Sequence, residues 1–202
     1  RKMQMHFSPI KEEAIKNKLI VQQAPRIIEL KQTIIQAKPD YLLVVAYGEI
    51  IPKEILEIPK IASINIHPSL LPKYRGASPI QETILNGDKY TGISWIIMNR
   101  KMDCGDIISQ IKVDVQSKDT SETLSDLLSK LSSIHTPKVL MNFIQNRATE
   151  KQDESQSSYC KKISKNAGQI NVSEENAVSI IRKIKAYSVW PTCYIVWNNK
   201  RL

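Results

Sequence analysis

Residues 62–76 read ASINIHPSLLPKYRG, and the first six of them alternate in the manner of a β-strand. On such a strand Asn65 and His67 point to one face of the sheet, while the neighbouring isoleucines point to the other. Pro68 follows His67 and ends the strand, which places the histidine at the strand's C-terminal end. Because open α/β sheets bind ligands at that end, the stretch predicts a strand that carries a functional amide and imidazole.

The segments before this strand predict a sheet covered by helices. Residues 41–46 form a continuous apolar run, which is typical of a strand buried on both faces. Apolar residues at helical spacing precede the run over 25–38 and follow it over 53–58. This alternation of helix and strand is typical of the α/β class, with a central, mostly parallel sheet.

The loop after His67 leads into a helix and then into two strands. Ser78 and Pro79 join an N-cap to a proline at the first helical position, which predicts a helix over 79–85. Strands are expected over 92–98 and 107–115, on either side of a short polar turn. Because that turn is short, we expect these two strands to pair in antiparallel fashion.

The next part of the chain is expected to be helical and to end in a polar linker. Apolar spacing predicts helices over 120–134 and 137–146. We expect them to separate at Pro137, because proline lacks the N–H that a helix interior needs. Residues 148–158 are polar and unpatterned, which is typical of a linker.

These boundaries divide the chain into three parts. Residues 1–147 form the α/β domain, residues 148–158 form the linker, and residues 159–202 begin a second domain. The chain starts at Arg1 without a signal segment, and the strand-like stretch 192–197 is followed by a turn and little more. We therefore expect the chain to be part of a longer protein.

Composition excludes several classes of protein. The 202 residues are 42% hydrophobic, and no stretch approaches 18 uncharged apolar residues, which excludes a membrane span. Three cysteines lie 56 and 33 residues apart, a spacing that fits neither a disulfide framework nor a zinc site. We therefore expect a reducing, cytoplasmic setting and no bound metal.

The net charge of +9 is concentrated near the C-terminus, where residues 151–202 carry nine basic and four acidic side chains. A helix expected over 174–186 has apolar residues on one face and Arg182, Lys183 and Lys185 on the other. Such a basic face could attract a polyanion. A lysine-rich, solvated surface is the simpler interpretation of the charge alone.

Three groups of residues could carry chemistry, and each has a plain structural alternative. Asn65 and His67 are costly to bury without partners, but a histidine at a strand exit is often simply hydrogen-bonded. The leucines of loop 69–76 could wall a pocket or fill the core. Asp103 could hold an imidazole charged or take a proton from an amine, although aspartate there is also ordinary turn chemistry.

Taken together, the motifs of this chain resemble the signature of the 10-formyltetrahydrofolate-dependent formyltransferases. The resemblance extends over nearly the whole chain, from about Ser8 onward. Its motifs are Asn65-x-His67, Ser69-Leu70-Leu71-Pro72-x-x-Arg75-Gly76 and Asp103-x-Gly105, with Ala46-Tyr47-Gly48 upstream and Trp190-Pro191 downstream. The upstream motif 46–48 and the downstream motif 190–191 narrow the resemblance to family members that formylate methionine on initiator tRNA.

The resemblance implies a role for each matching residue. Asn65 would hold the formyl oxygen, His67 would stabilise the oxyanion, and Asp103 would tune the histidine and assist proton removal. Tetrahydrofolate would contact a segment of four residues: Ser69, Leu70, Leu71 and Pro72. The physics agrees, because formyl transfer to an amine passes through a tetrahedral intermediate that fixed donors stabilise.

The resemblance also implies an architecture. The family's domain is Rossmann-like, and an OB-type barrel that helps to bind tRNA follows it through a linker. This chain would then lack the family's first strand and would stop just inside the barrel, with Arg1 and Lys2 as the tail of a missing tRNA-gripping loop. A cytoplasmic monomer is expected, with full activity only in a longer protein.

The chain departs from the family pattern in one loop. The family often reads Asp-x-Gly-Leu-Asp-Thr-Gly, whereas this chain reads NRKMDCG over 99–105. The first acidic residue and the first glycine are absent, while Asp103 is in place.

Two alternatives stay open. The same donor could formylate another acceptor, either an amino sugar nucleotide or glycinamide ribonucleotide. A protein of another class, a non-catalytic and basic RNA-binding fragment, could also keep the fold without turnover. The basic helix around Arg182 and the incipient barrel favour tRNA, because OB barrels commonly bind nucleic acid.

Overall fold

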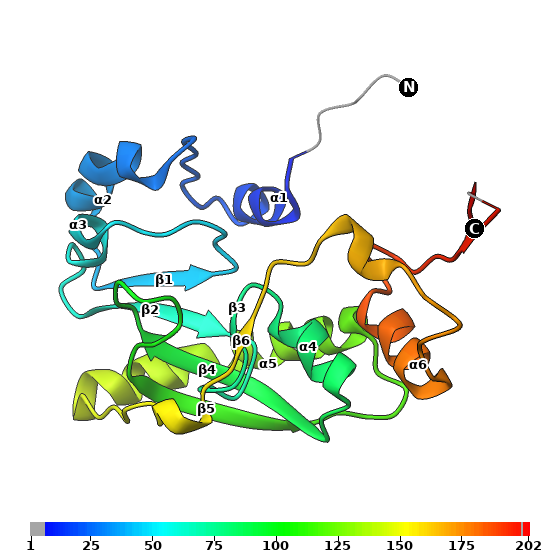
Figure 1. Cartoon of the computed structure of the whole chain (residues 1–202). Helices are drawn as coiled ribbons and strands as arrows, with labels where there is room; N and C mark the ends of the chain where they lie inside the picture. The colour runs from blue at the N-terminus through cyan, green and yellow to red at the C-terminus, as the bar shows by residue number, and fades with distance from the viewer. Residues whose placement is uncertain (1–6, 199) are drawn as a thin grey trace.

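A four-stranded sheet lies at the centre of the computed structural model, which describes residues 7–198 and 200–202 (Figure 1). The strands of this sheet, in spatial order, are β1 (Tyr41–Val45), β2 (Ala62–His67), β4 (Tyr90–Ile97) and β5 (Ile107–Asp114). The short strands β3 (Arg75–Gly76) and β6 (Tyr159–Cys160) form a separate pair, as do β7 (Val196–Trp197) and β8 (Lys200–Arg201). Arg1 and Lys2, the expected tail of a tRNA-gripping loop, lie outside the described residues.

Helices connect the strands. The α-helices are α1 (Pro9–Lys16), α2 (Lys31–Ala37), α3 (Lys53–Leu56), α4 (Pro79–Asn86), α5 (Ser121–Asn146) and α6 (Ala177–Ala186). Three 3-10 helices, η1 (Ile27–Leu30), η2 (Glu154–Gln156) and η3 (Lys165–Gly168), complete the described elements. The α/β class predicted from the alternation of helix and strand is confirmed.

The sheet combines both kinds of pairing. β1 and β2 are parallel, as expected for strands joined through a helix, whereas β2 pairs with β4 and β4 with β5 in antiparallel fashion. The expectation of parallel strands thus holds for β1 and β2. The turn between β4 and β5 is too short for a crossover, so β5 has to run back beside β4.

The two faces of the sheet carry different layers (Figure 1). On one face α4, α5 and α6 enclose the main core, in which Ile64 of β2 and Trp95 of β4 are fully buried. On the other face Val44 packs with residues of the α3 region, and Leu71 packs with Ile96 and Ile107. Asn65 and His67 point to this second face, because they alternate with Ile64 along β2.

The expected break at Pro137 is wrong, because α5 continues through it as one helix of 26 residues. Buried side chains lie on both sides of the proline, with Leu128 before it and Phe143 after it. Next to it, the buried hydroxyl of Thr136 accepts a hydrogen bond from Trp95 Nε1 at 3.0 Å. Packing against the sheet thus outweighs the one helical hydrogen bond that the proline removes.

The polar segment 148–158 packs closely on the domain. Glu150 exchanges two backbone hydrogen bonds with Ile107, at 2.7 and 2.8 Å. Ser158 donates its N–H to the carbonyl of Pro72 and accepts the N–H of Arg75. Residues expected to act as a linker therefore form part of the wall behind the loop after β2.

Helix α6 is turned opposite to the expectation, because its charged side chains face the molecule. Lys183 forms an ion pair with Glu175 (Nζ–Oε2 2.7 Å), Lys185 donates to the carbonyl of Ser117, and Arg182 lies close against the C-terminal end of α4. The exposed side chains are Val178, Ile181 and Ile184, at 58, 51 and 49%. The long basic side chains lie along the surface of the domain and use their charged ends there.

Among the described residues, no helix has both the length and the hydropathy that crossing a membrane requires.

Candidate active site

Two segments bring Asn65, His67 and Asp103 together, and we call these residues the polar triad. β2 supplies Asn65 and His67, and the turn between β4 and β5 supplies Asp103. Asn65 Nδ2 donates to Asp103 Oδ1 at 3.1 Å, and His67 Nδ1 lies 3.6 Å from Asp103 Oδ2. The structure thus places an amide, an imidazole and a carboxylate at the C-terminal end of a central strand.

The Asp103 carboxylate is held by donors on both oxygens. Besides the bond from Asn65, Oδ2 accepts the backbone N–H of Gly76 at 2.9 Å. Asp103 itself has φ +53°, in the left-handed region that aspartate enters more readily than most residues. Gly76 has φ +113°, and a Cβ there would meet the carbonyl oxygen of Cys160, so only glycine fits beside the carboxylate.

His67 is a buried histidine whose two ring nitrogens face different partners. Nε2 lies 2.9 Å from the carbonyl oxygen of Tyr74 and must donate to it, since a carbonyl only accepts. Nδ1 faces Asp103. Burial lowers the pKa of His67 below its ordinary value, while Asp103 and the Tyr74 carbonyl act in the opposite direction. The net lowering favours a neutral imidazole that carries its proton on Nε2.

We predict that His67 makes the protein less stable in acid. Below its ordinary pKa of 6.5 the histidine takes up a proton in the unfolded chain, whereas the buried ring of the folded protein resists protonation. The free energy of unfolding is therefore expected to fall as the pH drops below 6.5, and His67→Gln to reduce that fall. Denaturant titrations from about pH 7.5 to about pH 5 measure this; equal pH slopes in both proteins would contradict it.

The four residues expected to contact folate are placed differently from one another. Ser69 and Leu71 are buried: Ser69 Oγ donates to the carbonyl of Lys73 at 2.6 Å, and Leu71 N donates to Ser94 Oγ at 3.1 Å. Leu70 and Pro72 are half-buried. The leucines of this loop were expected either to wall a pocket or to fill the core, and each alternative holds for one of them. Leu71 fills the core, while Leu70 lines a cavity of ≈ 250 Å³.

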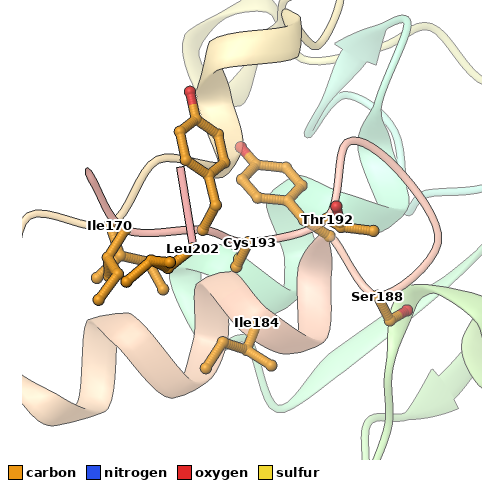
Figure 2. Close-up of a pocket in the computed structure, with 9 residues that line it drawn as sticks. Ile170, Ile184, Ser188, Thr192, Cys193 and Leu202 are labelled. Atoms are coloured by element: carbon orange, nitrogen blue, oxygen red, sulfur yellow. The ribbon is translucent and has the colours of Figure 1, made fainter. Parts of the chain in front are cut away.

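A second cavity lies elsewhere, beside α6 (Figure 2). It measures ≈ 410 Å³, and its lining includes Ile170, Ile184, Cys193 and Leu202. No member of the polar triad lines it, so this cavity is separate from the residues that could carry chemistry.

Arg75 joins the polar triad to segment 148–158, a role that its place in the sequence motif does not indicate. Its side chain is fully buried and binds Gln152 and Glu154. Hydrogen bonds to Glu154 raise the pKa of the guanidinium, and the same contact lowers the pKa of the Glu154 carboxyl. A buried arginine needs such acceptors, and the polar run 152–154 supplies two of them, although nothing in that run indicates which group they bind.

Comparison with known proteins identifies the family. Residues 3–140 match a family model described as Formyl transferase, and residues 162–202 match the model of its C-terminal domain. The chain belongs to the formyl transferase family. The first match contains the whole polar triad, and the second begins shortly after β6.

Curated relatives of this chain share one name. A methionyl-tRNA formyltransferase of Caldicellulosiruptor saccharolyticus is 39% identical over all of this chain and 65% of the relative. One of Nitratiruptor sp. is 47% identical over 78% of this chain and 50% of the relative. The chain thus spans between half and about two thirds of the length of these relatives.

Several solved structures share the fold of this chain. A sugar N-formyltransferase of Shewanella sp. aligns over 94% of this chain and 77% of its own, with TM-score 0.74 and 20% identity. HypX of Aquifex aeolicus, in complex with tetrahydrofolic acid, aligns over 85% of this chain and 30% of its own, with TM-score 0.71 and 17% identity. At these identities the likeness confirms the Rossmann-like fold alone.

Proposed function

We propose that the protein transfers a formyl group from 10-formyltetrahydrofolate to the α-amino group of methionine on initiator tRNA. The observation that carries the proposal is the convergence of Asn65, His67 and Asp103 at the C-terminal end of β2. Relatives named methionyl-tRNA formyltransferase, at 35–47% identity, support the choice of reaction and acceptor.

Each member of the polar triad has a step for which its geometry suits it. The methionine nitrogen attacks the formyl carbon, and the carbonyl oxygen becomes an oxyanion. Asn65 uses one N–H on Asp103 and can aim the other at that oxygen. His67, protonated on Nε2, supplies a second donor once its bond to Tyr74 is exchanged for one to the oxyanion.

Asp103 completes the transfer of protons. Its carboxylate accepts the proton that the attacking amine loses. The bond between the formyl carbon and N10 of the folate then breaks, and N10 takes up a proton as tetrahydrofolate leaves. The new C–N bond forms before the old one breaks, and the proton lost by the amine balances the proton gained by N10, so the transfer needs no oxidant or reductant.

The loop after β2 is proposed to contact the folate. Ser69 and Leu71 fix its shape from inside, which leaves Leu70 and Pro72 with surface to meet a planar ring. We further propose that residues 159–202 begin a tRNA-binding domain of the OB type. The match of 162–202 to the C-terminal family model supports this.

A cytoplasmic monomer is the setting proposed for this reaction. The cysteines of the described chain are all free thiols, which suits a reducing compartment. Because Lys183 and Lys185 are engaged within the molecule, we no longer assign tRNA binding to α6. The acceptor arm would then be bound by other surfaces of the full-length protein.

An acceptor screen tests the proposal. The protein at its natural length is mixed with 10-formyltetrahydrofolate and one of three acceptors: initiator methionyl-tRNA, an amino sugar nucleotide or glycinamide ribonucleotide. We expect formylated methionine on the tRNA and at most traces on the other two. Formylation of the sugar nucleotide or of the ribonucleotide alone would refute the tRNA assignment, and RNA binding without any transfer would establish the non-catalytic alternative.

A further inference from the structure

Gln152 holds the turn that carries Asp103, although it lies in the segment expected to be a linker. Its Nε2 donates to the carbonyl oxygen of Asp103 at 2.8 Å and to that of Gly105 at 2.7 Å. We propose that Gln152 is a positioning residue: it fixes the backbone of this turn and so aims the Asp103 carboxylate at the rest of the polar triad. The proposal rests on the formyl transfer proposed above.

Both the oxygen and the nitrogen of the Gln152 side-chain amide form hydrogen bonds. Its Oε1 accepts from Nε of Arg75 at 2.9 Å and from Nη2 at 2.7 Å. With the two bonds to the turn, Gln152 makes all four hydrogen bonds that a glutamine amide can make. Only one orientation satisfies them, because a flipped amide would point its N–H groups at the guanidinium and its oxygen at two carbonyls.

Arg75 is a fixed anchor for that amide. Nη1 and Nη2 donate to the two carboxylate oxygens of Glu154, each at 2.9 Å, and Nη1 also donates to the hydroxyl of Tyr159 at 3.1 Å. Together with the bonds to Gln152, all five N–H groups of the guanidinium are engaged. The fully buried Arg75 therefore has little freedom to move, and Gln152 connects the turn to this fixed side chain through hydrogen bonds.

The turn needs such support because of its backbone. Asp103 has φ +53°, in the left-handed region that L-residues adopt only rarely. The residue after Arg75 completes the arrangement, since the N–H of Gly76 donates to the Asp103 carboxylate at 2.9 Å. Gly76 thus binds the carboxylate of Asp103 directly, while Arg75 holds the carbonyl of Asp103 through Gln152.

Gln152→Glu tests the proposal with little change of shape. The glutamate can still accept from Arg75, but it has no N–H for the two carbonyls and its charge repels them. We expect kcat for formyl transfer to fall by about 10- to 100-fold, the scale of a misplaced catalytic group, with KM for folate and acceptor within about threefold. In an Asp103→Asn background the same change should cost less than about threefold, because Gln152 acts through Asp103.

Gln156→Glu is the matched control. It makes the same change of charge in the same segment, at an exposed side chain that bonds only to Asp153 among the contacts of the described chain. We expect its kcat to equal that of the wild type. An equal loss for Gln152→Glu in the wild-type and Asp103→Asn backgrounds, or a loss below about threefold in the wild type, would overturn the proposal.

A spectroscopic measurement decides the matter without activity. The amide proton of Gly76 should resonate downfield because it donates to the Asp103 carboxylate. In Gln152→Glu we expect this resonance to move upfield and its hydrogen exchange to quicken, while the amides of β4 keep their shifts. An unmoved Gly76 resonance refutes the positioning role, whereas a wild-type protein that transfers no formyl group refutes the proposed function instead.

Discussion

Replacement of His67 by alanine is expected to lower turnover in the full-length protein by about 10²–10⁴-fold, the scale of a positioned acid–base group. The ring is buried at the end of β2, with Nε2 on the Tyr74 carbonyl and Nδ1 facing Asp103. Alanine removes the Nε2–H that we propose is transferred from the Tyr74 carbonyl to the developing oxyanion. Steady-state formylation of methionyl-tRNA measures the loss.

His135→Ala is the control for that experiment. His135 lies in α5, remote in sequence from the polar triad, and its replacement should leave turnover within about twofold of the wild type. Thermal unfolding of both variants separates lost chemistry from lost folding. A decrease of less than about tenfold for His67→Ala in a folded protein would return His67 to a purely structural role.

Asp103→Asn is expected to lower turnover by about 10²–10³-fold. The carboxylate accepts from Asn65 Nδ2 at 3.1 Å and from the N–H of Gly76 at 2.9 Å, and both of its oxygens are therefore acceptors. Asparagine turns one of these atoms into a donor, which must face another donor. It also removes the negative charge that raises the proton affinity of His67.

The pH profile of Asp103→Asn gives a second measurement. Since the Asp103 charge opposes the lowering of the His67 pKa by burial, the variant's histidine should titrate at lower pH than that of the wild type. Asp106→Asn, three residues along the same connection, is the matched control and should show neither effect. Wild-type turnover in Asp103→Asn would remove the carboxylate from the mechanism.

Local patterns predicted most of the elements because each carries its own signal. The alternation over 62–67 and the apolar run over 41–46 gave strands at β2 and β1 with nearly the same bounds. The predicted helix break at Pro137 was wrong because packing decides whether the helix continues. Apolar residues that are distant in sequence pack against both halves of α5 and keep it as one helix. The predicted orientation of α6 was wrong for a related reason. Amphipathic periodicity shows that a helix has two different faces, but it does not show which face packs against the domain.

The strand pattern placed Asn65 and His67 on one face, but only the resemblance to the formyltransferases joined Asp103 to them in one predicted site. The roles of Gln152 and Glu154 could not be predicted, because nothing in a polar stretch of sequence states which distant group it binds. Their partner Arg75 belongs to a motif that the sequence shows. Its guanidinium needs acceptors because it is buried, and that burial is known only from the structure.

The contacts of segment 148–158 define where this protein can be divided. A cut between α5 and β6 would take Gln152, Glu154 and Tyr159 away from Arg75, so that all five N–H groups of its guanidinium would lose their acceptors. The unit that holds the polar triad therefore extends past the end of α5 to Cys160. Chimaeras that exchange C-terminal halves between relatives should be joined after that residue, so that each N-terminal half keeps its own strip of polar side chains.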